Sequence, residues 1–133
     1  MTTVSKGYAF LLLLLTIGLM SASMAWAAGA PPRGVYGCYD VRMDYRQHMV
    51  ITPMPVVMFG LIDAATYADF DGQRGHYTYD PAAEVLTFTD GPRQGWRYRK
   101  IDEWSFRLID NNTGHEIYTC PLDASKDPTR GPW

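Results

Sequence analysis

Short stretches that alternate apolar and polar residues, separated by turn sequences, dominate the second half of this 133-residue chain. The turn sequences are Asp71-Gly72, Asp80-Pro81, Asp90-Gly91-Pro92 and Asp110-Asn111-Asn112-Thr113-Gly114. An alternation of period two predicts strands with one buried and one solvent-facing side, and turns at such intervals are typical of all-β domains. No segment after residue 60 shows the 3.6-residue period of an amphipathic helix. The pattern therefore predicts an antiparallel β-meander.

The apolar positions of these stretches form the predicted core. Its members are Tyr77, Tyr79, Leu86, Phe88, Trp96, Tyr98, Trp104, Phe106, Leu108 and Tyr118. Arg97 and Arg99 alternate onto the opposite side of the strand from Trp96 and Tyr98. A single-strand nucleic-acid binder needs basic and aromatic side chains on one surface. We therefore interpret the basic stretch 93–100 as a solvated outer face.

Upstream of the meander, Val35–Arg42 reads as a first strand and Val56–Ile62 as a second. The segment between them, Met43–Pro55, is the least regular part of the chain. Asp44–Met49 is compatible with a helical turn, which the prolines that follow would prevent from growing into a helix. Residues 121–133 contain three prolines and few apolar residues, which predicts a C-terminal tail.

The N-terminal segment predicts export. Lys6 precedes an apolar run from Tyr8 to Met20, and small residues follow up to Ala27. This order is that of a secretory signal peptide covering residues 1–27, with the β domain at 28–120. An uncleaved membrane anchor is the alternative, because no charge occurs between Lys6 and Arg33 and about 20 apolar residues suffice to span a bilayer. The predicted location is periplasmic or secreted, or else N-terminally anchored.

The only two cysteines, Cys38 and Cys120, lie near the two ends of the predicted β domain. In an exported chain two cysteines most often form a disulfide, and this one would close a loop of about 80 residues. Six to eight short strands suit a small barrel or a two-sheet sandwich. The barrel is favoured because adjacent first and last strands would bring the cysteines together and leave no exposed sheet edge.

Three sequence motifs add a resemblance. They are Gly34-Val35-Tyr36-Gly37-Cys38, then Gly75-His76-Tyr77-Thr78-Tyr79-Asp80-Pro81, then Gly91-Pro92 before a lone cysteine. The chain thus resembles small uncharacterised exported bacterial proteins with the pattern G-x-Y-x-C, G-x-Y-x-Y-D-P, G-P and a final C. The match covers most of residues 34–120, while the segment 43–55 and the long tail depart from it. The resemblance implies export, the disulfide and a β fold, and it implies no activity.

Composition and motifs give little support to catalysis. A formal net charge of −2 without an acidic tail or a basic arm does not point to nucleic acid. No G-x-S-x-G nucleophile motif or calcium-loop spacing occurs. The weak metal candidates are Met43, His48, Met49 and Met54, because thioether and imidazole suit Cu(I). The ordinary interpretation is that methionines fill gaps in a small core, so we expect no metal and no cofactor.

These observations predict an exported, non-enzymatic β-barrel that binds an unknown protein or small ligand, or that supports an envelope assembly. The binding site is expected near residues 43–55, because long irregular insertions on rigid scaffolds often bind. Three alternatives stay open: a membrane-anchored accessory subunit, a periplasmic copper-binding protein and a small hydrolase. Membrane contact is expected only if the N-terminal segment is retained.

Overall fold

Ten strands joined by short turns make up residues 29–133, the part of the chain that this computed structural model describes. The predicted signal peptide at 1–27 lies outside the described residues. The strands are β1 (Gly34–Tyr36), β2 (Tyr39–Met43), β3 (Met49–Pro53), β4 (Phe59–Leu61), β5 (Thr66–Asp69), β6 (Arg74–Asp80), β7 (Val85–Phe88), β8 (Arg97–Asp102), β9 (Ser105–Ile109) and β10 (Glu116–Asp123). A single 3₁₀ turn, η1 (Pro55–Val57), precedes β4. Between residues 29 and 133 no helix has the length and apolar character needed to cross a membrane.

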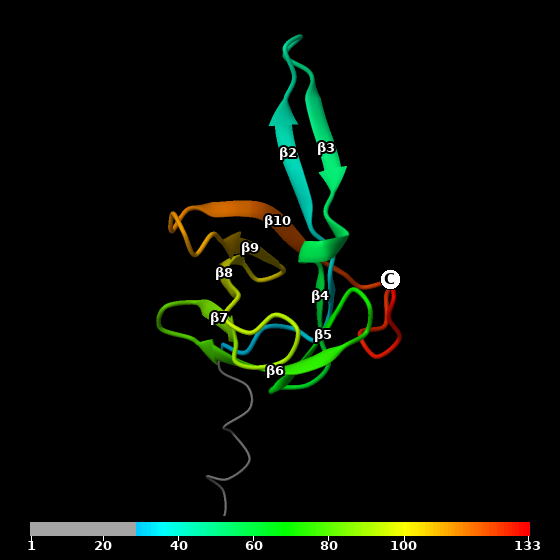
Figure 1. Cartoon of the computed structure of the whole chain (residues 1–133), viewed down its shortest axis with the longest axis vertical. Coiled ribbons are helices and arrows are strands. Elements are labelled where there is room, and N and C mark those ends of the chain that lie inside the picture. Colours follow the sequence, from blue (N-terminus) through cyan, green and yellow to red (C-terminus); the bar gives the residue numbers. More distant parts are fainter. Residues whose placement is uncertain (1–28) are drawn as a thin grey trace, which may run out of the picture. The chain divides into compact units, whose positions relative to one another are not determined.

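Eight of the strands close into an antiparallel barrel. Their order is β1-β4-β5-β6-β7-β8-β9-β10, and β10 pairs back onto β1. The closing register places Val35 opposite Asp123 and Tyr36 opposite Leu122. Figure 1 shows this barrel as the lower part of the ribbon, with β2 and β3 rising from it. The predicted all-β barrel is therefore confirmed over the sandwich.

Aromatic rings fill the interior of the barrel. Tyr36 stacks on Phe59 with 5.0 Å between ring centroids, and Tyr67 stacks on Phe88 at 3.9 Å. Tyr98 tilts against Phe59 at 4.5 Å, and all five side chains are fully buried. Such ring pairs add about 0.5–1.5 kcal/mol each beyond the area that they bury. The centre of the barrel is thus a packed core made of side chains from β1, β4, β5, β7 and β8.

Most of the predicted core residues are confirmed. Tyr77, Leu86, Phe88, Tyr98 and Phe106 are buried, and the others except Trp104 are partly buried against the core. The prediction that Trp104 belongs to the core is wrong, because this residue is 56% exposed. Trp104 lies in the turn before β9, which begins at Ser105. The apolar–polar alternation of the sequence therefore extends one residue beyond the strand.

The predicted boundary of the C-terminal tail is also wrong. β10 continues through Pro121 to Asp123 and supplies the closing pairs with β1. Beyond it, the side chain of Trp133 packs over β4, where a Cβ added to Gly60 would lie 2.9 Å from the indole ring. All three residues of β4 are buried, Phe59 and Leu61 in the core and Gly60 beneath Trp133. The last residues therefore cover one outer face of the barrel.

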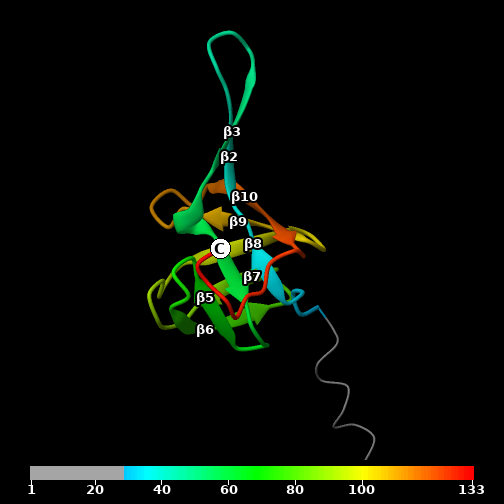
Figure 2. The ribbon, with the colours of Figure 1, turned by 90° about the vertical axis from the view of Figure 1, so that its right-hand side faces the viewer.

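The predicted first strand, Val35–Arg42, divides into two strands with different roles. β1 belongs to the barrel, the chain leaves it at Gly37 and Cys38, and β2 then pairs with β3 as a hairpin. Figure 2 shows this hairpin as a separate ribbon above the barrel. The helical turn expected at Asp44–Met49 is absent there, because this segment forms the hairpin loop and the start of β3.

Cys38 and Cys120 form the predicted disulfide across a separation of 82 residues. Replacing both by Ser should lower the free energy of unfolding by up to about 4–5 kcal/mol, because the unfolded chain gains the entropy of an unclosed loop. Urea unfolding of the protein and the double variant measures this difference. Equal stabilities, or two free thiols in the unreduced native protein, would contradict the bond.

Burial makes the folded protein resist tyrosine ionisation. It raises the pKa of Tyr77 to about 12, with a smaller contribution from Asp63. The neutral hydroxyl is therefore favoured by folding, so this contribution to stability is complete below the unfolded value near 10 and is lost as pH rises toward 12.

We expect stability to fall between about pH 9 and about pH 11, and to fall less in Tyr77→Phe, which has no hydroxyl to ionise. Urea unfolding of both proteins at the two pH values checks this. The same loss in both would show that Tyr77 does not contribute.

Candidate interaction arm

The hairpin formed by Tyr39–Pro53, here called the arm, has one face made only of apolar side chains. The register pairs Tyr39 with Pro53, Val41 with Ile51, and Met43 with Met49. Residues directly opposite each other in an antiparallel pair project to the same side. These six side chains therefore form one continuous apolar face.

The opposite face of the arm is mixed in character. It carries Asp40 opposite Thr52 and Arg42 opposite Val50, and Arg42 forms an ion pair with Asp40. The two faces thus differ sharply in polarity, as in a strand pair of a folded sheet. In the described structure, however, no second layer covers the outer part of the apolar face, where Val41, Met43, Met49 and Ile51 are exposed. β2 pairs with the barrel only at its first residue, Tyr39, which lies opposite Thr119.

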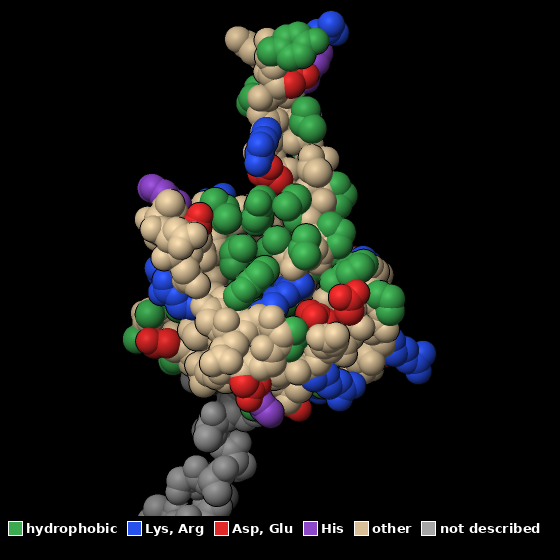
Figure 3. Space-filling model, viewed as in Figure 1, with side chains coloured by type: hydrophobic (Ala, Val, Ile, Leu, Met, Phe, Trp, Pro, Cys, Tyr) green, Lys and Arg blue, Asp and Glu red, His purple; other side chains and the backbone are tan. Residues whose placement is uncertain are grey.

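Exposed hydrophobic side chains concentrate on the arm. Of the nine large hydrophobic residues that are exposed in the described chain, seven lie between Val41 and Val56. Ile51 is 58% exposed and Met49 is 67% exposed. In Figure 3, green side chains gather along the arm and over the part of the barrel from which it rises. Contiguous exposed patches of this kind mark interaction surfaces in soluble proteins.

Local hydrogen bonds organise the tip of the arm. Asp44 Oδ1 accepts the backbone N–H groups of Arg46 and His48, both at 2.8 Å. The Gln47 N–H donates to the Asp44 carbonyl at 3.0 Å, and Gln47 adopts φ 61°. This is a three-residue hairpin loop with a left-handed third residue. Tyr45 is 88% exposed at the tip, with the Arg46 guanidinium 5.2 Å from its ring centre.

The base of the arm is fixed to the barrel on both chain segments. On the outgoing segment, Cys38 is bonded to Cys120 of β10. On the returning segment, the Met54 N–H donates to the Cys38 carbonyl at 2.8 Å. The two segments are thus tied to each other and to β10 at one point, which limits the directions in which the arm can project.

Two side chains from the barrel hold the segment that follows the arm. The buried Tyr98 hydroxyl donates to the Val57 carbonyl at 2.8 Å, and Arg93 donates to the Met58 carbonyl. The Arg93 guanidinium also lies 4.9 Å from the Trp96 ring centre. Arg93 is only 6% exposed, so the interpretation of stretch 93–100 as a solvated face is wrong at this residue. It holds for Arg99, which is exposed.

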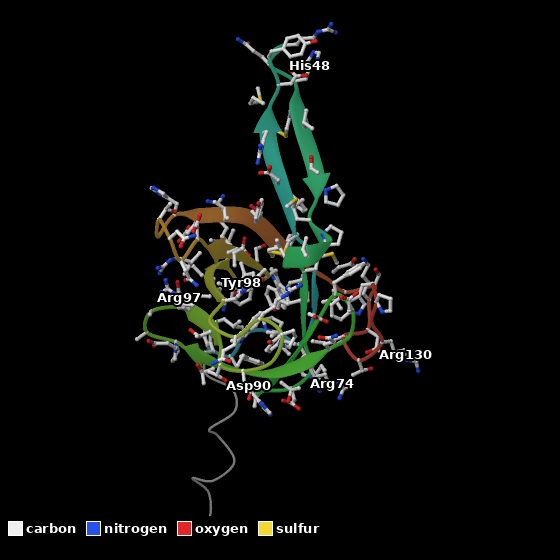
Figure 4. The ribbon with its side chains drawn as sticks, in the orientation of Figure 1. His48, Arg74, Asp90, Arg97, Tyr98 and Arg130 are labelled. Atoms are coloured by element: carbon white, nitrogen blue, oxygen red, sulfur yellow. A yellow bond between two sulfur atoms is a disulfide. The ribbon has the colours of Figure 1, made fainter. Side chains whose placement is uncertain are left out.

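Three of the weak metal candidates lie on the arm and the fourth lies at its base, and they do not converge. Met43 and Met49 are direct partners on the apolar face. His48 belongs to the opposite face, with its Nδ1 3.6 Å from the Asp44 carboxylate, and Figure 4 shows it at the far end of the arm. Met54 is at the base and packs against the core. Within residues 29–133 no three His, Cys, Asp or Glu side chains gather as metal ligands.

A polar concavity of about 330 Å³ lies where the arm leaves the barrel. It is lined by Tyr39, Asp40, Val41, Arg42, Arg107, Glu116, Ile117, Tyr118 and Thr119. Tyr118 adopts φ 57° beside a register irregularity between β10 and β9. A non-glycine residue held in this backbone conformation costs about 1–3 kcal/mol. Here the irregularity has a structural reason, because β10 pairs with three strands, β9, β2 and β1, at successive positions along its length.

The His76 and Asp90 side chains form the clearest acid–base pair in the described structure. Nδ1 lies 2.9 Å from Oδ2, and the hydrogen bond from the His76 side chain lowers the pKa of Asp90. The pair is open to solvent, with side-chain exposures of 64% and 57%. The neighbouring Thr89 hydroxyl donates to the His76 carbonyl rather than to the ring. The pair ties β6 to the end of β7 and offers no aligned nucleophile.

Sequence reasoning placed a site near 43–55 but missed the residues that define the apolar face. Val41 and Ile51 were not singled out, nor was Tyr45 at the tip. The signal was present, since Tyr39, Val41 and Met43 alternate with charged residues. It was hidden because the loop residue with positive φ is Gln47, where glycine or asparagine would have marked a hairpin.

The anchor at the base of the arm can be tested with two tyrosines. Tyr98→Phe should reduce the free energy of unfolding by about 1–3 kcal/mol, because it leaves the Val57 carbonyl without its donor inside the protein. Tyr45→Phe, the matched control at the exposed tip, should change it by less than about 0.5 kcal/mol. Urea unfolding measures both. A loss of stability for Tyr98→Phe no larger than that of the control would show that the Tyr98 hydroxyl does not anchor this segment.

No protein-family model, no curated protein and no solved structure matches the chain.

Proposed function

We propose that the protein is an exported, non-enzymatic binding module that docks a partner protein through the apolar face of its arm. The observation that carries the proposal is the ladder of three apolar cross-strand pairs from Tyr39–Pro53 to Met43–Met49, of which the two outer pairs are exposed. A hairpin needs no such ladder to be soluble, and an isolated two-stranded hairpin is marginally stable at best. The disulfide and the Tyr98 anchor hold this apolar ribbon away from the barrel.

The residue types of the arm suit a protein surface. Methionine, tyrosine and arginine are enriched at protein interfaces, and the arm carries Met43, Tyr45, Arg46 and Met49. Flexible thioether side chains adapt their shape to a partner, and tyrosine and arginine often dominate the binding energy. Burying each large apolar side chain contributes about 1.5–3 kcal/mol.

A lipid bilayer is a poorer occupant than a protein. A two-stranded ribbon has backbone N–H and C=O groups along its edges that no neighbouring strand pairs with. In hydrocarbon each such group costs several kcal/mol, which is why membranes are spanned by helices or closed barrels. The tip would also have to carry Asp44 and Arg46 into the lipid.

Other features support two further parts of the proposal. One is that binding occurs without catalysis, and the other is export. The barrel interior is occupied by aromatic rings, which leaves the outer surfaces to bind. The most evident acid–base pair, His76 with Asp90, has no aligned hydroxyl. The Cys38–Cys120 disulfide is the kind of bond that forms and persists in oxidising compartments.

Site-specific photo-crosslinking in the cells that produce the protein tests the docking face. A photoreactive phenylalanine analogue at Val41, on the apolar face, should give a discrete adduct with a partner protein. The same analogue at Thr52 on the other face and at Thr78, exposed on β6, should give much weaker adducts or none. Adducts of equal intensity from all three positions, or none from Val41, would contradict the proposal.

A further inference from the structure

The outer edge of β3 is an unpaired strand edge. β3 is the last strand in the sheet order, and β2 is its only partner among the described strands. The Asp44 N–H donates to the His48 carbonyl, which identifies that pair as hydrogen-bonded. Bonded pairs alternate along an antiparallel ladder, so Arg42 with Val50 comes next. The backbone N–H and C=O groups of Met49 and Ile51 consequently point outward.

This edge lacks most of the protection that natural proteins give to such strands. Exposed edges are usually blocked by lysine, proline, a bulge or a covering loop. β3 reads Met-Val-Ile-Thr-Pro, without a charge, and only Pro53 lacks an N–H. Closing the barrel removes the edges of its eight strands. The outer edge of β2 is also open beyond Tyr39, but β2 carries Asp40 and Arg42, so the edge of β3 is the uncharged one. A further β-strand paired along this edge would satisfy the outward-pointing N–H and C=O groups of Met49 and Ile51.

We propose that β3 pairs antiparallel with β3 of a second copy of this chain, about a two-fold axis through Val50. In this register Met49 lies opposite Ile51 of the second copy, and Ile51 opposite its Met49. The two pairs of outward-facing residues then exchange four backbone hydrogen bonds. Because β3 is uncharged, no like charges oppose each other across the axis. The contact is isologous, so it closes as a dimer.

Neighbouring registers are less favourable. Moving the axis to Ile51 places Met49 opposite Pro53, which has no N–H to donate. Moving it to Met49 places Ile51 opposite Gln47, whose positive φ of 61° interrupts the extended strand. The axis through Val50 is the register that uses both Met49 and Ile51 fully.

The same register brings the tip of each arm to the base of the other. Residues 45–47 lie beside residues 53–55 of the second copy, next to Val56, which is 68% exposed. About a dozen residues of each copy take part, whereas standard stable interfaces use roughly 20–30 residues on each side. The dimer is therefore expected to be weak and dependent on concentration.

Self-pairing and docking use different atoms of the arm. Pairing uses the backbone edge of β3, while docking uses the side chains of the apolar face. In the dimer the two apolar faces lie side by side on one four-stranded sheet and stay open to a partner. The two proposals can therefore fail separately.

Charge substitutions at Val50 test the axis directly. Val50 is 44% exposed on the mixed face, so Lys or Glu there should leave the fold intact, as circular dichroism and urea unfolding can verify. At the axis the two Val50 side chains lie about 4.5–5.5 Å apart at Cβ. Val50→Lys alone and Val50→Glu alone should each weaken dimerisation at least about tenfold, because like charges would oppose each other. Val50→Thr is the uncharged control and should dimerise as the native protein does.

Sedimentation equilibrium of the protein isolated from its producing cells, from about 1 µM to about 500 µM, measures the association. The native protein should change from monomer to dimer across this range. An equimolar mixture of Val50→Lys and Val50→Glu should recover the dimer that each variant alone has lost. A native protein that is monomeric throughout, a mixture that stays monomeric, or a Val50→Lys dimer as strong as the native one would overturn the proposal. Crosslinking from Val41 to a different protein would still support docking in each of those cases.

Discussion

The bond between Cys38 and Cys120 fixes the point on which the rest of the structure depends. β1 ends just before Cys38 and β2 begins just after it, while Cys120 belongs to the strand that pairs with β1, β2 and β9. The barrel therefore closes and the arm departs at the same place. Closure itself uses two residue pairs between β1 and β10, so a covalent link beside them limits how far those strands can separate. A free-standing hairpin with an apolar face would be poorly defined without such a fixed origin.

The barrel and the arm follow opposite rules of burial. In the barrel, aromatic rings from six strands contact each other inside a closed sheet, and even the outer side of β4 is covered by Trp133. In the arm, equally apolar side chains face solvent on a ribbon that keeps an unpaired edge. Hydrophobic burial drives folding, so a contiguous patch of apolar side chains left outside is the feature on which the proposed docking rests.

Local pattern was enough to predict the barrel and not enough to predict the arm. Period-two alternation identified the strands that carry Tyr77, Phe88, Tyr98 and Phe106, because one face of each strand is buried in the core. The same rule failed at Trp104, which lies in a turn beyond the core, and at residues 121–123, where a strand continues through Pro121. The outgoing strand of the hairpin does alternate, with Tyr39, Val41 and Met43 between charged residues, but the loop conformation at Gln47 has no sequence marker. The sequence therefore predicted only a region for the candidate site, residues 43–55, and not the side chains that form it.

The arm is a preformed ribbon whose β3 edge is open. Amide hydrogen exchange, followed by NMR in dilute solution where the chain is monomeric, tests this residue by residue. Exchange should be slow for the amide of Val50, which bonds across to β2, and fast for the flanking amides of Met49 and Ile51, which face outward. Uniformly fast exchange from Tyr39 to Pro53 would contradict it, because the arm would then be an unstructured loop.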